Sequence, residues 1–267
     1  MSVAHYLVAN IPSVFLGLIM VAVAATFSTV GVLLVGRFVG FDKLRDHNDV
    51  AGPIFGTLGV LYAVLLAFVV IVSWENYDRA HMDVVAEANN YANIYRNASG
   101  FDEAFRSEVR GRMDSYLQTV IDEEWPLLAR GERSPEVQRL ADQFWQLVGQ
   151  YEPKKEGEKI FLAECVRQMN EAGEYRRQRL VDAQTGIHPL LWFVLLTGGV
   201  ITVAFTFFFG ARNLMVQLVM TNMLAVVIAL ILLTMLELDH PFSGDVSIRA
   251  EPFKQVLLFI RRETSGS

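Results

Sequence analysis

Four long windows without a charged side chain constrain this chain of 267 residues more than any other feature of its sequence. They cover residues 11–35, 52–72, 188–210 and 214–236, and none of them contains Asp, Glu, Lys or Arg. An α-helix rises about 1.5 Å per residue, so roughly 20 apolar residues cross a hydrocarbon core of about 30 Å. The sequence therefore predicts an all-α, polytopic membrane protein with four transmembrane helices.

The windows divide the chain into four predicted parts. Residues 1–74 hold the first pair of transmembrane helices, 75–186 a helical soluble domain, 187–236 the second pair, and 237–267 a C-terminal segment. Apolar residues spaced by three and four predict helices throughout 75–186, with breaks at Gly100, at Ser134 and Pro135, and at Pro153. No Gly or Pro lies between Gly59 and Gly100, so the second transmembrane helix should continue into the soluble domain as one rod.

The position of the charges bears on partners and on orientation. Residues 75–186 contain 21 acidic and 15 basic side chains, and an acidic surface of this kind argues against binding to nucleic acid. An even number of crossings puts both termini and the inserted domain on one side. The basic cluster "RRQR", residues 176–179, precedes the third window and favours the cytoplasmic side. Trp74 and Trp192 are expected at the same interface as amphipathic anchors.

The sequence shows no signature of an enzyme. Its five histidines form no HExxH pair, and it has neither a GxSxG elbow nor a phosphate-binding glycine loop. The single cysteine, Cys165, is interpreted as a small buried apolar side chain. We therefore expect no catalytic residues, no metal site and no cofactor.

Polar side chains inside the windows are neutral. Transport coupled to protons or cations usually needs a charged group within the membrane, and the windows offer none. Threonine hydroxyls such as those of Thr26, Thr202 and Thr206 are expected to hydrogen-bond to the preceding helical turn. A neutral throat with helix termini supplying partial charge suits large, weakly hydrated anions better than protons.

The second window has two different helical faces. One face carries small residues, at Gly52, Gly56, Gly59, Ala63 and Ala67, and the other carries large apolar ones, at Ile54, Leu58, Leu61, Leu65, Phe68 and Val72. The small face could pack closely against another helix or border a narrow axis where several copies meet. The large face could contact lipid or protein, or form a hydrophobic constriction.

Several motifs together resemble those of a known family. In order they are "YAVLLAFVVIVSWENYDRA", "EANNYANIYR", "EEWP", "RRQRL" and "LDHPFSG". This arrangement resembles the bacterial bestrophin-like membrane family and, more distantly, the bestrophin anion channels, over nearly the whole chain.

The resemblance implies a homo-oligomer, by analogy a pentamer, in the lipid bilayer of the bacterial inner membrane, conducting inorganic anions such as chloride. In bestrophins the second span forms a narrow apolar neck, which implies pore-lining residues near Gly56, Val60 and Val64. The alternative pore face is Leu61, Leu65 and Phe68. No counterpart of the acidic calcium clasp of animal bestrophins is evident, so calcium gating is not expected.

Two other functional classes share this topology. A stator-like component of an ion-driven machine also has two plus two spans and a cytoplasmic insert, but it needs an ionisable group in the conduction path. A non-conducting membrane scaffold or stress-response protein needs no such group. The sequence leaves both of them open beside the channel.

Overall fold

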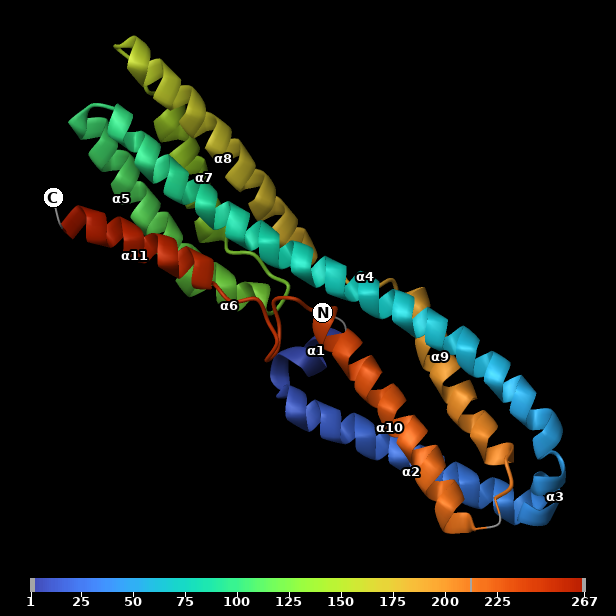
Figure 1. The fold of residues 1–267 in the computed structure, drawn as a ribbon. Helices are drawn as coiled ribbons and strands as arrows, with labels where there is room; N and C mark the ends of the chain where they lie inside the picture. The colour runs from blue at the N-terminus through green and yellow to red at the C-terminus, as the bar shows by residue number, and fades with distance from the viewer. Residues whose placement is uncertain (1–2, 212, 266–267) are drawn as a thin grey trace.

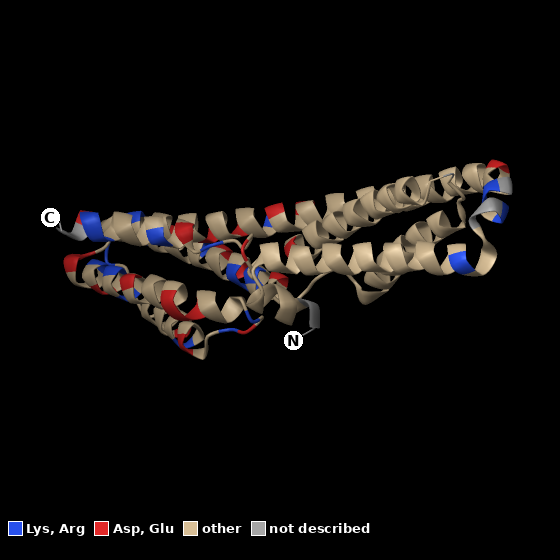
Figure 2. Ribbon diagram, turned by 90° about the horizontal axis from the view of Figure 1, so that it is seen from below, with Lys and Arg blue, Asp and Glu red and all other residues tan. Residues whose placement is uncertain are grey.

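The computed structural model describes residues 3–211 and 213–265, so residues 1–2 and 266–267 of the first and last predicted parts lie outside it. In the described part of the chain, helices and their connections make up an elongated molecule with no strand (Figure 1). Charged residues gather in one half of the molecule and at the far tip of the other half (Figure 2). The membrane helices make up this second half, which is almost free of charge between its two ends.

Four helices are long and apolar enough to cross a membrane, which confirms the predicted class. They are α2 (Ser13–Val39), α4 (Asn48–Asn97), α9 (Pro189–Phe205, continued by η3, Thr206–Phe208) and α10 (Leu214–Leu238). Two short helices flank them, α1 (Val3–Asn10) before α2 and α3 (Phe41–Asp46) between α2 and α4.

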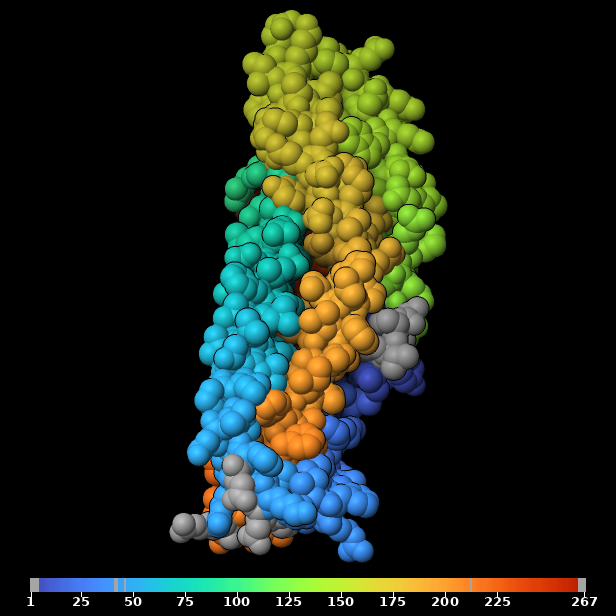
Figure 3. Space-filling view, turned by 90° about the vertical axis from the view of Figure 1, so that its right-hand side faces the viewer, coloured from blue at the N-terminus to red at the C-terminus, as the bar shows by residue number. Residues whose placement is uncertain are grey.

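Helix α4 connects the two halves without interruption. It has 50 residues, which at about 1.5 Å per residue corresponds to roughly 75 Å. Figure 3 shows it running along one side of the molecule beside α9 and then α8. The predicted continuous rod is therefore confirmed, and it ends at Asn97 with a short 3₁₀ turn, η1 (Ala98–Gly100), at the expected break.

The soluble half packs helices around the outer part of α4. These are α5 (Glu103–Thr119), the π-helical turn η2 (Val120–Glu124), α6 (Trp125–Leu128), α7 (Pro135–Gly149), α8 (Glu156–Asp182) and α11 (Glu251–Ser265). Ser134 caps α7 as its sequence predicts, because its hydroxyl accepts a hydrogen bond from the Val137 amide at 3.2 Å. Helix α11 was not predicted, and it buries Phe253 and Ile260 in the common core.

Close helix approach and hydroxyl bonding hold the membrane half together. Tyr62 of α4 lies against Gly198 and Gly199 of α9, where an added Cβ would come within 2.8 Å of its ring or hydroxyl. Its hydroxyl donates to the Leu195 carbonyl at 3.0 Å. The predicted bonds to the preceding turn are present at Thr26, Thr202 and Thr206. Ser28 also bonds to the preceding turn, at the Ala25 carbonyl, and Ser28 and Thr29 both connect α2 to the side-chain amide of Asn222 in α10.

A buried ion-pair network joins α4, η2 and α8. Arg179 lies fully buried between Glu87, with Nε to Oε2 at 2.7 Å, and Glu124, with Nη2 to Oε2 at 3.0 Å. Arg176 completes the network with a second bond to Glu124 at 2.7 Å. Burial raises the pKa of a carboxyl, but Arg179 and Arg176 outweigh burial and hold the pKa of Glu124 below its ordinary value. The two positive and two negative charges of this set cancel.

This network changes the interpretation of the basic cluster before α9. Of its three arginines, Arg176 and Arg179 are buried in ion pairs, and only Arg177 is exposed. The cluster therefore supplies one solvent-facing positive charge rather than three. Only Arg177 therefore counts towards the excess of positive charge that is typical of cytoplasmic loops.

We predict that Arg179→Ala lowers the free energy of unfolding by about 3–5 kcal/mol, because it leaves Glu87 buried without its charged partner and Glu124 paired with Arg176 alone. The matched control is Arg177→Ala, which removes an exposed pair with Glu174 and should change stability by less than about 1 kcal/mol. Denaturant unfolding of the detergent-solubilised protein measures both. Equal losses in the two variants would show that the buried pairs do not stabilise the junction.

Candidate functional site

The membrane part of α4 has one face turned away from its own subunit. Tyr62, Leu66, Val69 and Ser73 are buried and face the other membrane helices. On the opposite side, the relative exposures are 64% at Val60, 50% at Val64 and 53% at Ile71. This apolar face extends along the membrane part of the helix, so in the membrane it must contact lipid, another subunit or a pathway.

The small residues of α4 do not serve packing within the subunit. An added Cβ at Gly52, Gly56 or Gly59 would meet no atom within 4 Å. These glycines therefore leave room for a neighbour that is not part of this subunit. Among the predicted pore-lining residues, Gly56, Val60 and Val64 all lie on uncovered parts of the helix.

The alternative pore face is divided by the structure. Leu61 and Phe68 are each 66% exposed, whereas Leu65 is partly buried and packs against the membrane core. Leu65 thus already has neighbours within the subunit, unlike Val60 and Val64. The three residues of the first set share a more uniformly open environment than the three of the second.

Charged residues of both signs lie at each end of this face (Figure 2), with exposed Arg79 beside the acidic residues and exposed Asp49 beside the basic ones. Exposed Glu75 and Asp78 follow the membrane part of α4 on the side of the soluble half. Asp78 lies seven and fourteen residues after Ile71 and Val64, so the three share a helical face. At the far tip Lys43 and Arg45 are exposed.

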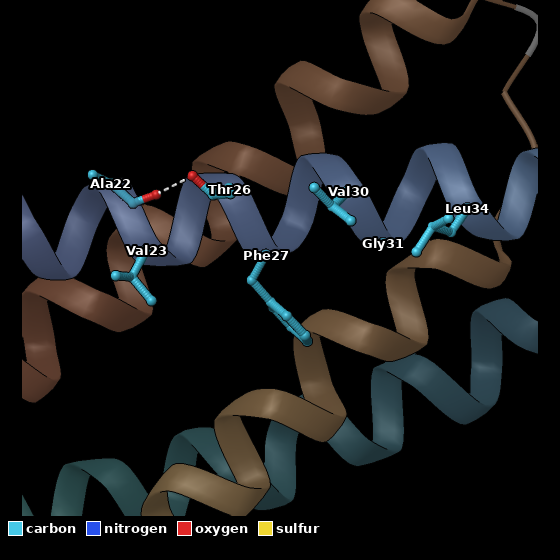
Figure 4. A pocket seen from close by; sticks show the side chains of 7 residues that line it. All are labelled: Ala22, Val23, Thr26, Phe27, Val30, Gly31 and Leu34. Atoms are coloured by element: carbon cyan, nitrogen blue, oxygen red, sulfur yellow. Dashed lines mark hydrogen bonds between the residues drawn. The ribbon is translucent and has the colours of Figure 1, made fainter.

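A shallow apolar groove of about 550 Å³ lies along the outer side of α2 (Figure 4). Its lining residues are Ala22, Val23, Thr26, Phe27, Val30, Gly31 and Leu34. The hydroxyl of Thr26 already donates to the Ala22 carbonyl at 2.7 Å, as Figure 4 shows. The groove therefore offers dispersion contacts rather than polar recognition, which suits an acyl chain or an apolar helix face.

The turn after α10 ties the membrane helices to the soluble half. Asp239 accepts hydrogen bonds from the Ile187 amide and from Nε1 of Trp192, the latter at 3.1 Å. This fixes one of the two predicted interface tryptophans. The other, Trp74, is exposed on α4 and stacks on Tyr77 at a ring-centroid distance of 6.2 Å. The chain turns after α10, and Gly244 in this turn has a φ of 77°.

One carboxylate at this junction was missed by the sequence reasoning. The charge-free window ends at Leu236, but α10 continues to Leu238 and includes Glu237, which is buried. Its carboxylate lies beside the buried Ser13 hydroxyl. Nearby, Asp245 accepts from the Ser13 amide at 2.8 Å. Such a set can take up a proton or a small cation, although no group of three His, Cys, Asp or Glu side chains gathers in the described chain.

Comparison with protein families and with curated proteins gives one match. The profile of the Bestrophin-like domain matches residues 22–253. No curated protein sequence is significantly similar to the chain.

Solved structures share the fold. A bacterial bestrophin homologue from Klebsiella pneumoniae, phased by zinc anomalous diffraction, has a TM-score of 0.61 at 13% identity, covering 92% of this chain and 96% of that one. A point variant of that homologue has a TM-score of 0.66 at 13% identity, covering 92% and 99%. A variant described only as a membrane protein has a TM-score of 0.66 at 11% identity, covering 92% and 96%. At these identities the likeness concerns the fold alone.

Proposed function

Because the chain belongs to the Bestrophin-like family, we propose that it forms a homo-oligomeric ion channel in which α4 of each subunit lines a shared axis. The observation that carries this proposal is the uncovered apolar face of Val60, Val64 and Ile71, directed away from the subunit's own helices. A membrane helix that faces lipid alone has no need of the three glycines beside this face. By the family resemblance, the assembly is a pentamer.

The neck of the proposed pore is formed by Gly56, Val60 and Val64. These residues have no close packing partner in the subunit, and small or β-branched side chains around an axis give a narrow apolar constriction. The alternative face places Leu61 and Phe68 at the axis. Leu65 fits that face less well, because it contributes to the core of its own subunit.

The single native cysteine allows a direct test of the two faces. Cys165 is buried, and burial raises the pKa of its thiol to about 12, so a water-soluble thiol reagent should leave it unmodified. We predict that the reagent blocks current through Val60→Cys and Val64→Cys channels in planar bilayers. Leu61→Cys and Phe68→Cys are the matched controls, since both residues are at least as exposed in the subunit as Val60 and Val64. Block of the controls alone would assign the pore to the alternative face.

We propose that the conducted ions are inorganic anions such as chloride. The neck is uncharged, and the exposed Lys43 and Arg45 at the far tip would raise the local concentration of anions. A specific observation favours a second candidate, a cation channel. Glu75 and Asp78 would form an acidic ring at the other mouth, where they would attract cations.

Reversal potentials under a potassium chloride gradient separate the two selectivities. We expect a value near that for chloride, and a shift further towards it in Glu75→Gln/Asp78→Asn, which removes the acidic ring. Lys43→Gln/Arg45→Gln should shift it the opposite way. A wild-type value near that for potassium would establish the cation channel. A stable oligomer without current at any voltage would favour the non-conducting scaffold.

We place the soluble half and both termini in the cytoplasm, with the helices in the bacterial inner membrane. The even number of spans supports a common side for these parts, and Arg177 still faces solvent there. We predict that an impermeant thiol reagent leaves Glu152→Cys, which is exposed in the soluble half, unlabelled in intact spheroplasts and labels it after lysis. Labelling before lysis would reverse the orientation, and Lys43→Cys serves as the opposite-side control.

A further inference from the structure

A pocket of about 610 Å³ lies where the membrane half meets the soluble half. Its walls come from α1, the turn after α6, the connection from α8 to α9, and the turn after α10. These segments lie far apart in the sequence and converge at the level where the membrane helices begin and end (Figure 1). The pocket is separate from the exposed face of α4.

The pocket holds two opposite charges that do not neutralise each other. Arg130 is exposed, and its side chain makes no hydrogen bond or ion pair with any described residue. Asp239 accepts from the Ile187 amide and the Trp192 indole, both of which are uncharged, and no described cation pairs with it. A ligand that carries separate negative and positive groups can satisfy both side chains.

Two imidazoles also line the pocket. His5 and His240 meet edge to face with ring centroids 5.1 Å apart. His240 Nδ1 lies 3.1 Å from the Leu236 carbonyl, and because a carbonyl only accepts, Nδ1 carries the proton. Its Nε2 atom has no partner among the described residues. In this tautomer Nε2 is a hydrogen-bond acceptor, which suits an ammonium group.

The wall towards the membrane is apolar. Ile187, Pro189 and Trp192 line it, at the start of α9. Tryptophan is enriched at the level of lipid headgroups, and the Trp192 indole is fixed there by Asp239. The pocket therefore has charged residues on one side and an apolar wall on the other. A phospholipid has the same arrangement, with a charged headgroup next to apolar acyl chains.

We propose that this pocket binds a phospholipid with a zwitterionic headgroup. The phosphate lies towards Arg130, the ammonium towards Asp239 and Nε2 of His240, and the acyl chains leave past Pro189 and Trp192. Arginine is an established donor to phosphate oxygens, and a carboxylate with two neutral donors retains lone pairs for an ammonium. The proposal does not depend on conduction or on the number of subunits.

Native mass spectrometry of the full chain, purified in detergent and incubated with equal amounts of phosphatidylethanolamine and phosphatidylglycerol, tests the proposal. The expected result is preferential retention of phosphatidylethanolamine by the wild type. Arg130→Ala should lower its retention by about tenfold, through loss of a charged contact. Arg133→Ala, an exposed neighbour outside the pocket, should retain it like the wild type.

Asp239→Asn provides a second readout. The amide oxygen of asparagine can still accept from the Ile187 amide, while the negative charge is lost. We expect this variant to keep phospholipid but to lose the preference for the ethanolamine headgroup. Equal retention of the two lipids by the wild type, or unchanged retention in Arg130→Ala, would overturn the proposal.

Free phosphoethanolamine distinguishes a lipid from a soluble zwitterion of the same chemistry. Its effect on the thermal unfolding midpoint is compared with that of dihexanoyl-phosphatidylethanolamine at equal concentration, below the micellar range. The lipid should stabilise the wild type at concentrations at least about tenfold lower, since only the lipid covers the apolar wall. Equal potency of the two compounds would assign the pocket to a soluble ligand and overturn the lipid proposal.

Discussion

The ion pairs of Arg179 with Glu87 and Glu124 connect α4, η2 and α8 in the soluble half, outside the bilayer. Inside the membrane, apolar helices are confined by the hydrocarbon around them. Outside the bilayer, α4 and α8 are held together by the buried charges. These ion pairs would break if one of the two helices shifted along the other. The rings of Trp125 and Phe253 lie 4.9 Å and 5.6 Å from the Arg179 guanidinium, so α6 and α11 join the same centre. The soluble helices thereby keep a fixed position on the second membrane helix.

The membrane helices could be predicted from the sequence, because a helix that crosses the hydrocarbon core must have about 20 residues and no charged side chain. Both properties can be seen in a short window of the sequence. The continuous α4 was also predictable, because the absence of Gly and Pro is visible in the sequence. Ion pairs between residues far apart in the sequence are not visible in this way. Arg176 and Arg179 looked like interfacial charges beside α9, and only the fold shows that Glu87 and Glu124, 92 and 55 residues from Arg179, neutralise this pair of arginines. Phe253, Val256, Leu257 and Ile260 have the spacing of a helical face, so the helix α11 was predictable, but its packing against α4 and α5 was not.

The candidate pore residues were accessible to sequence reasoning in a limited sense. The division of the second window into small and large faces is a matter of spacing, and the structure shows which of these residues the subunit leaves uncovered. Leu65 illustrates the limit, since its spacing matches Leu61 and Phe68 but its environment does not. The junction pocket is a stronger case. His5, Arg130 and Asp239 come from separate segments, and nothing in their local sequence indicates that they share a cavity.

The unbroken course of α4 has a mechanical consequence. A helix of 50 residues without an internal kink or glycine hinge in its soluble half transmits rotation and tilt from end to end, as a lever does. Measured from Trp74 at the membrane interface, Asn97 lies 23 residues away on one side and Val60 lies 14 residues away on the other. A tilt of a few degrees about this point would displace both by about 1–3 Å, in opposite directions. Any molecule that binds and tilts the soluble helices would thus also move the apolar face of α4 in the membrane.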